Sequence, residues 1–210
     1  MHILKNLLSF LSLTLFVACG GGHNPDQDLV DGVPRSQSVG DEKFVTVDSS
    51  DQLEFGDGTL SGVGTVRFAS DLESVASNYH YKLIFSLEEG TELTLHSHAN
   101  ADLANGLDIR FKRVGASLQV FGTASGVTDD WTSFFKDINA TQAMAIGIDV
   151  HNDEPITHFI FWDNLSGAEL LDSAKDVAGG PGKGYGQNWG LSLLNAFVNK
   201  VEKGEPRGGH

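Results

Sequence analysis

Residues 79–87 read YHYKLIFSL, and this stretch decides the class of fold. Its large apolar side chains alternate with smaller or more polar ones: Tyr79, Tyr81, Leu83, Phe85 and Leu87 against His80, Lys82, Ile84 and Ser86. A period of two places alternate side chains on opposite faces of a β-strand. A helix would instead need apolar residues three and four positions apart. The stretch is therefore predicted to be a β-strand with one face on a core.

The same alternation recurs along the chain, at residues 92–96, 107–112, 117–120, 144–150 and 158–161. Shorter candidate strands cover residues 44–47, 52–55, 63–69 and 188–194, although the run from 188 to Lys200 is equally compatible with a short helix. Residues 131–138 (WTSFFKDI) fit a helical turn or an irregular crossover.

Short turns join the alternating stretches, among them Glu88-Glu89-Gly90 and Val114-Gly115-Ala116, which suit antiparallel hairpins. About nine or ten such strands cannot hide their apolar faces in one open sheet, so they need a second sheet or closure into a barrel. The prediction is an all-β fold, an antiparallel two-sheet β-sandwich covering residues 44–203, with a closed barrel as the alternative.

The order of these features resembles the concanavalin-like jelly roll, which includes laminin-G-type lectin domains. The resemblance covers residues 60–200, through YKLIFSL (81–87), then the hairpin GLDIRFKRVGASLQV (106–120), then AMAIGIDVHN (143–152) with ITHFIFWDN (156–164), and a closing Trp-Gly strand. It implies a lectin-like binding module that holds a glycan or a protein at its loop rim, and these families place calcium at such rims.

The first residues form a different kind of segment. Lys5 precedes an almost wholly apolar run, Leu7–Val17, that matches a signal-peptide core and is too short to span a bilayer. The run ends in Phe16-Val17-Ala18-Cys19, which resembles the bacterial lipobox, with Phe16 in place of the usual Leu. The resemblance implies that residues 1–18 are cleaved and that Cys19 carries acyl chains anchoring the protein to a membrane. The alternative is a secretory signal with a cysteine near its end by chance.

Residues 19–43 are rich in Gly, Asp, Ser and Pro and are predicted to be a flexible tether, and residues 204–210 a disordered tail. Cys19 is the one cysteine in the sequence, so no internal disulfide is expected. By resemblance to enterobacterial lipoproteins, Gly20 after the cysteine favours the outer membrane, on its periplasmic face or at the cell surface.

Acidic residues outnumber basic ones by 28 to 14, giving a formal charge of −14 at pH 7, and loss of Lys5 with the signal makes it one unit more negative. Such a surface repels nucleic acid, tolerates neutral sugars and attracts cations such as calcium.

Two groups of residues are candidate binding sites. Asp149, Asn152, Asp153 and Glu154 supply hard oxygen ligands at a hairpin tip, as calcium requires, although the same residue types also favour ordinary turns. Tyr185, Gln187 and Asn188 in the glycine-rich stretch 179–189, together with Trp131 after Asp129-Asp130, offer aromatic rings and amides for a sugar. Trp189, at the end of that loop, is expected instead to fill the core.

His96 and His98 lie two residues apart and could face one metal ion, but without further ligands they fit solvent-facing histidines at a strand end better. No GxSxG motif or paired-carboxylate strand is present, so an enzyme is not expected. Three functions remain open: a membrane-anchored binding module for a glycan or an envelope partner, a structural or envelope-assembly lipoprotein, and a polysaccharide hydrolase with an unrecognised site.

Overall fold

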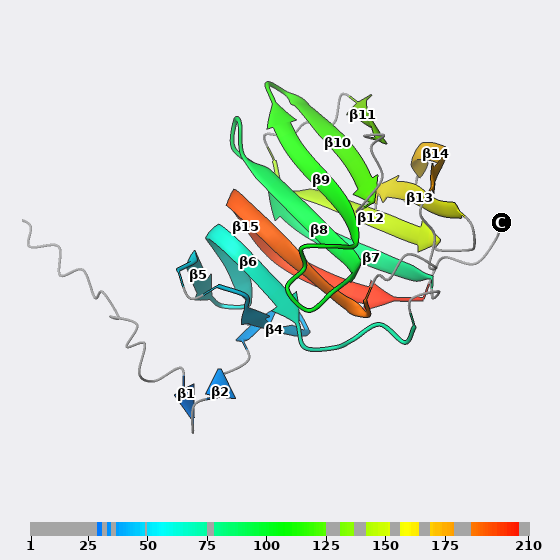
Figure 1. The fold of residues 1–210 in the computed structure, drawn as a ribbon. Helices are drawn as coiled ribbons and strands as arrows, with labels where there is room; N and C mark the ends of the chain where they lie inside the picture. Colours follow the sequence, from blue (N-terminus) through cyan, green and yellow to red (C-terminus); the bar gives the residue numbers. More distant parts are fainter. Residues whose placement is uncertain are drawn as a thin grey trace, which may run out of the picture. The chain divides into compact units, whose positions relative to one another are not determined.

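The computed structural model describes residues 29–30, 33–34, 37–48, 50–74, 78–124, 131–136, 142–151, 156–163, 169–178 and 186–205. The backbone alone is described at 29–30, 33–34, 123–124, 131–136, 156–158 and 169–178. Every regular element in these ranges is a strand (Figure 1). No helix in the described part of the chain has the length and hydropathy to cross a membrane. The expected signal peptide and Cys19 lie outside the described residues.

The chain divides into two compact units, residues 1–34 and residues 35–210. In the first unit, β1 (Leu29–Val30) and β2 (Val33–Pro34) form a short antiparallel hairpin.

The second unit begins with a small group of strands: β3 (Gln37–Val39), β4 (Glu42–Thr46), β5 (Gln52–Gly56) and β6 (Thr59–Phe68). The remaining strands make the body of the domain: β7 (Tyr79–Ser86), β8 (Glu92–Ala99), β9 (Leu107–Val114), β10 (Ser117–Ala124), β11 (Trp131–Lys136), β12 (Met144–His151), β13 (Ile156–Asp163), β14 (Glu169–Ala178) and β15 (Asn188–Gly204). All the ladders between these strands are antiparallel.

Strand β15 belongs to two layers. Its first half, Asn188–Leu194, pairs with β8 and extends to a layer in the order β11-β10-β9-β8-β15. Its second half, Phe197–Gly204, pairs with β7 and extends to a layer in the order β15-β7-β12-β13-β14. On the other side of β15, β6 pairs along both halves, from Gly190 to Val198. Figure 1 shows β8, β9 and β10 in front of β7, β12 and β13.

Side chains from the two layers meet in the core between them. The Phe111 ring of β9 lies 5.2 Å from Phe85 of β7 and packs edge-on against Phe161 of β13. The buried Tyr81 hydroxyl of β7 bonds the Ser97 hydroxyl of β8 at 2.8 Å, and burial raises the Tyr81 pKa far above its usual value. Contacts of this kind require two sheets face to face, so the predicted antiparallel two-sheet sandwich is confirmed.

The alternation that predicted the strands sorts the side chains between core and surface. Tyr79, Tyr81, Leu83 and Phe85 are buried, while the residues between them are half-buried. Trp189 is fully buried, as expected, and stacks on Phe68 with the ring centroids 4.0 Å apart.

Several elements differ from their predicted form. The run from 188 to Lys200 is a strand throughout, and residues 131–136, expected to be a helical turn or a crossover, form the edge strand β11. Strand β14 was not foreseen. Strand β3 and the start of β4 lie inside the range 19–43 that was expected to be a tether, since Gln37 pairs with Phe44 and Phe44 pairs with Phe68.

The division of β15 between the layers takes place at Asn195. Its register with β6 shifts between Leu194 and Ala196, and the intervening Asn195 has a φ of 55°. This left-handed conformation is accessible to asparagine and glycine, whereas a β-branched residue is strained there. The bulge turns the strand away from β8 and towards β7.

Replacement of Asn195 tests this bulge. The variant Asn195→Gly should keep the stability of the native protein, because glycine adopts a positive φ freely. The variant Asn195→Val should lose about 1–2 kcal/mol of unfolding free energy. Urea unfolding measures both, and equal stability of the two variants would show that residue 195 is not held in a left-handed conformation.

Candidate functional site

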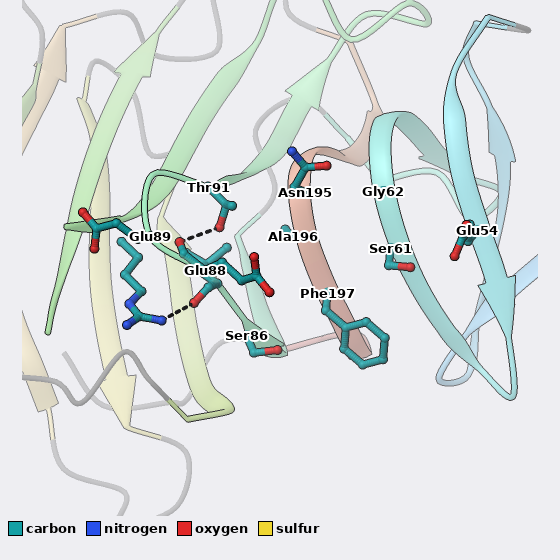
Figure 2. A pocket seen from close by; sticks show the side chains of 12 residues that line it. Glu54, Ser61, Gly62, Ser86, Glu88, Glu89, Thr91, Asn195, Ala196 and Phe197 are labelled. Atoms are coloured by element: carbon teal, nitrogen blue, oxygen red, sulfur yellow. Dashed lines mark hydrogen bonds between the residues drawn. The ribbon is translucent and has the colours of Figure 1, made fainter. Parts of the chain in front are cut away.

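The separation of β8 from β7 at Asn195 leaves a surface hollow of about 920 Å³. Its floor is the Asn195–Phe197 segment of β15 together with Ser61 and Gly62 of β6. Figure 2 shows the β7–β8 hairpin facing this segment of β15, with Ser61 and Glu54 on its other side. The full lining is Glu54, Ser61, Gly62, Ser86, Leu87, Glu88, Glu89, Thr91, Arg113, Asn195, Ala196 and Phe197.

A row of side chains crosses four strands in this hollow. Glu54 of β5 is directly opposite Ser61 of β6, Ser61 is opposite Phe197 of β15, and Phe197 is opposite Ser86 of β7. Side chains directly opposite in an antiparallel pair stand side by side on the same face. The row therefore presents a carboxylate, two hydroxyls and an aromatic ring in a line, and 39 % of Phe197 is exposed.

Gly62 allows β6 to lie close against β5 beside the bulge. Gly62 has a φ of 105°, and a Cβ atom there would lie 2.1 Å from the carbonyl oxygen of Gln52. A residue with a side chain would clash with β5 at this position. The floor of the hollow is thus fixed by backbone geometry.

The wall made by the β7–β8 hairpin is tied to β9. Arg113 donates from Nη1 to the carbonyl oxygen of Leu87 at 3.1 Å and from Nε to the carbonyl oxygen of Gly115 at 2.9 Å. The Glu89 carboxylate accepts a bond from the Gly115 backbone N–H at 2.6 Å. Hydrogen bonds with a charged partner are among the stronger ones in proteins, so this wall is preformed.

The charge of the hollow is negative. Glu54, Glu88 and Glu89 line it, and Arg113 is the single cation in the lining, with its donors turned to loop carbonyls. An anionic ligand would be repelled here, whereas hydroxyl groups can donate to carboxylates.

Apolar side chains continue the hollow along the same face. Leu194 and Val63 are directly opposite each other, next to the Phe197 row, and are 46 % and 38 % exposed. Neighbouring exposed apolar side chains of this size mark a surface that is suited to contact.

The residues expected to bind a sugar lie elsewhere. The Gln187 amide donates to the carbonyl oxygens of Leu72 and Glu73, and the Asn188 amide donates to that of Ala99. Both residues hold neighbouring loops at the start of β15, about 30 Å along the strand from Phe197. Tyr185 lies outside the described residues, and Trp131 is described in its backbone alone.

Asp149, expected to be a calcium ligand, is buried on β12. One of its carboxylate oxygens accepts from Trp162 Nε1 at 2.6 Å, and the other lies 2.6 Å from His80 Nδ1. Asn152, Asp153 and Glu154 lie outside the described residues, so the calcium prediction depends on those three. Among the described side chains, no group of three or more His, Cys, Asp or Glu residues could hold a metal ion.

The two neighbouring histidines do not share a site, nor do they face solvent. His96 and His98 are both buried. His96 bonds Asp108 and Ser192, at 2.7 Å each, whereas His98 has a φ of 50° and bonds Ser97 at 2.8 Å. The positive φ of His98 interrupts the alternation of side chains between the two faces of the strand. The prediction that His96 and His98 point to the same side is therefore wrong.

Sequence reasoning missed the residues of the hollow. Phe197 was not marked because the run from 188 to Lys200 could be read as a strand or as a helix, and the two readings give it different faces. Glu54 and Ser61 carry no motif, and although they pair with each other in a local hairpin, Ser61 meets Phe197 only through a pairing across more than 130 residues.

No protein-family model and no curated protein matches this chain. Among solved structures, it is similar to a carbohydrate-binding module, CBM66 from Bacillus subtilis, with 12 % identity and a TM-score of 0.50 over 76 % of this chain and 94 % of the module. A legume lectin-like domain from Entamoeba histolytica is 11 % identical, with a TM-score of 0.47 over 77 % of this chain and 89 % of that domain. The exoplasmic/lumenal domain of VIP36 in a Ca²⁺- and mannose-bound form is 9 % identical, with a TM-score of 0.47 over 86 % of this chain and 87 % of that domain.

At this level of identity, the similarity to the carbohydrate-binding module concerns the fold alone. The chain therefore shares with this module an all-β antiparallel sandwich fold.

Proposed function

We propose that the sandwich is a glycan-binding module and that its ligand lies in the hollow beside Asn195. The observation that carries the proposal is the row Glu54, Ser61, Phe197 and Ser86, which combines an exposed ring with hydrogen-bonding groups on four paired strands.

The chemistry of a sugar fits this row. A pyranose has an apolar C–H face that packs on an aromatic ring, and hydroxyl groups around its edge that need donors and acceptors. Phe197 offers the ring, while Glu54, Ser61 and Ser86 lie on either side of it. The wall tied by Arg113 is already in place, so little conformational entropy is lost on binding.

The charge of the hollow narrows the ligand to neutral or amino sugars, because Glu54, Glu88 and Glu89 would repel carboxylated or sulfated chains. The fold is consistent with this role, since the similar structure from Bacillus subtilis is named a carbohydrate-binding module. We assign no catalytic step to this hollow.

The proposal includes a lipid anchor. Cys19, at the end of an apolar leader, would carry the acyl chains and hold the module at the outer membrane, on its periplasmic face or at the cell surface. The proposal also places calcium at Asn152, Asp153 and Glu154, where it would stabilise the loop. Calcium has no part in the hollow.

A second function is favoured by one observation. Val63, Leu194 and Phe197 are exposed apolar neighbours, and an envelope protein could cover them as readily as a sugar could. In that case the chain would be a structural or envelope-assembly lipoprotein.

Phe197→Ala separates these functions. On an array of neutral, amino and acidic oligosaccharides, the native domain should bind neutral or amino sugars, and the variant should bind them at least about tenfold more weakly, since loss of one stacking ring corresponds to ~1.4 kcal/mol. Val47→Ala, at an exposed valine in the connection between β4 and β5, is the matched control and should bind normally. Absence of binding by the native domain, or equal binding by both variants, would favour the envelope-assembly function.

Cys19→Ser tests the anchor. The native protein should carry at least two acyl chains at its mature N-terminus, since a single chain binds a membrane only reversibly. It should therefore fractionate with membranes. The serine variant should lose both the acyl chains and the membrane fraction. A native protein without acyl groups would rule out the lipoprotein assignment.

A further inference from the structure

We propose that Ser192, His96 and Asp108 form an ester-cleaving site on the outer face of the β15-β8-β9 layer, with Ser192 as the nucleophile. The site is separate from the hollow, and it is built from residues that lie far apart in the sequence.

The three side chains are linked in the order that such chemistry requires. His96 Nδ1 lies 2.7 Å from Asp108 Oδ1, and His96 Nε2 lies 2.7 Å from Ser192 Oγ. Both ring nitrogens are therefore engaged, one by a carboxylate and the other by a hydroxyl. This is the geometry by which a serine, a histidine and an acid are recognised as a catalytic group, whatever the fold that carries them.

The sheet register accounts for the arrangement. Asp108 of β9 is directly opposite His96 of β8, and Gly190 of β15 is opposite His96 on the other side. Ser192 is two residues further along β15, on the same face as Gly190. The imidazole reaches Ser192 along this face, with 2.7 Å between Nε2 and Oγ.

The hydrogen bonds fix the proton on the ring. An ionised Asp108 can only accept, so Nδ1 carries the hydrogen and Nε2 is left with a lone pair. Ser192 Oγ then donates its proton to Nε2. Thr65 Oγ1 lies 2.8 Å from Ser192 Oγ, where it can donate to the oxygen that would attack.

The three groups differ in their exposure. The His96 side chain is 10 % exposed and that of Asp108 is 33 % exposed, while Ser192 is half-buried. Leu103, in the connection between β8 and β9, lies over Gly190, since a Cβ atom at Gly190 would be 2.4 Å from Leu103 Cδ1. A substrate of the proposed site would be a small ester, such as the acetyl ester of a sugar hydroxyl, that reaches Ser192 from its exposed side.

The reaction balances without a cofactor. Ser192 Oγ attacks the ester carbonyl carbon, its proton passes to His96 Nε2, and the alcohol leaves with that proton as the C–O bond breaks. Water then attacks the acyl-serine, gives a proton to His96, and the carboxylic acid leaves as Ser192 Oγ takes the proton back. The net change is ester plus water to acid plus alcohol.

Charge on the carbonyl oxygen must be held by side chains. Ser192 is in the middle of a strand that is paired with β6 and β8, so its backbone does not form an oxyanion hole. The proposal assigns this role to the Thr65 hydroxyl, which lies 2.8 Å from Ser192 Oγ. Loss of one oxyanion donor slows an enzyme by about 10²–10³, so we expect slow turnover and a nucleophile that is best detected by covalent labelling.

The test is labelling of the native, folded protein with a fluorophosphonate probe, with mapping of the adduct by mass spectrometry and assay of p-nitrophenyl acetate hydrolysis. The adduct should be on Ser192. Ser192→Ala should remove it and lower hydrolysis to the background rate, while Ser38→Ala, at an exposed serine on β3, should change neither.

Asp108 is a positioning residue, and its variants separate catalysis from structure. Asp108→Asn should slow labelling at least tenfold, and Asp108→Glu should recover part of the rate, while circular dichroism shows an unchanged fold. No adduct on Ser192, or hydrolysis unaffected by Ser192→Ala, would show that the network is structural. Neither readout involves Phe197, so this result is independent of the glycan-binding test.

Discussion

One strand, β15, is shared by both layers of the sandwich, and the left-handed backbone of Asn195 makes this sharing possible. Without the bulge, an extended chain of this length would continue along a single sheet. With the bulge, β8 pairs with the part of β15 before Asn195, and β7 pairs with the part after it, along the same edge of the strand. The two layers therefore separate at the bulge. The buried rings of Phe85, Phe111 and Phe161 then fill the space between them.

The bulge also divides the outer face of β15 into two regions with different chemistry. After Asn195, the β7–β8 hairpin forms a wall and the floor carries Phe197, which suits a ligand held by stacking and hydroxyl contacts. Before it, Ser192 lies within a hydrogen-bonded series that includes His96 and Asp108. About 10 Å of strand separates Ser192 from Asn195, so a glycan chain in the hollow could extend towards the serine.

The alternation of apolar and polar residues predicted the strands in which it is strong, because burial of one face dictates which residues are large and apolar. It did not predict which distant strands pair with one another. The triplet His96-Ser97-His98 showed two imidazoles, but not that the positive φ of His98 separates them. Asp108 could have been placed opposite His96 from the hairpin, whereas Ser192 reaches them through a pairing of strands about 95 residues apart. Strand β3 was read as tether because it is short and polar, and its pairing with β4 is what orders it.

Assigned backbone amide NMR spectra, recorded during titration with the oligosaccharide series, test most directly whether the separation of the layers at Asn195 creates the ligand site. The account predicts that chemical-shift changes concentrate at residues 195–197 of β15, at Ser61 and Gly62 of β6, and in the β7–β8 hairpin. Shift changes confined to the start of β15, near Gln187 and Asn188, would contradict it, and so would a complete absence of change.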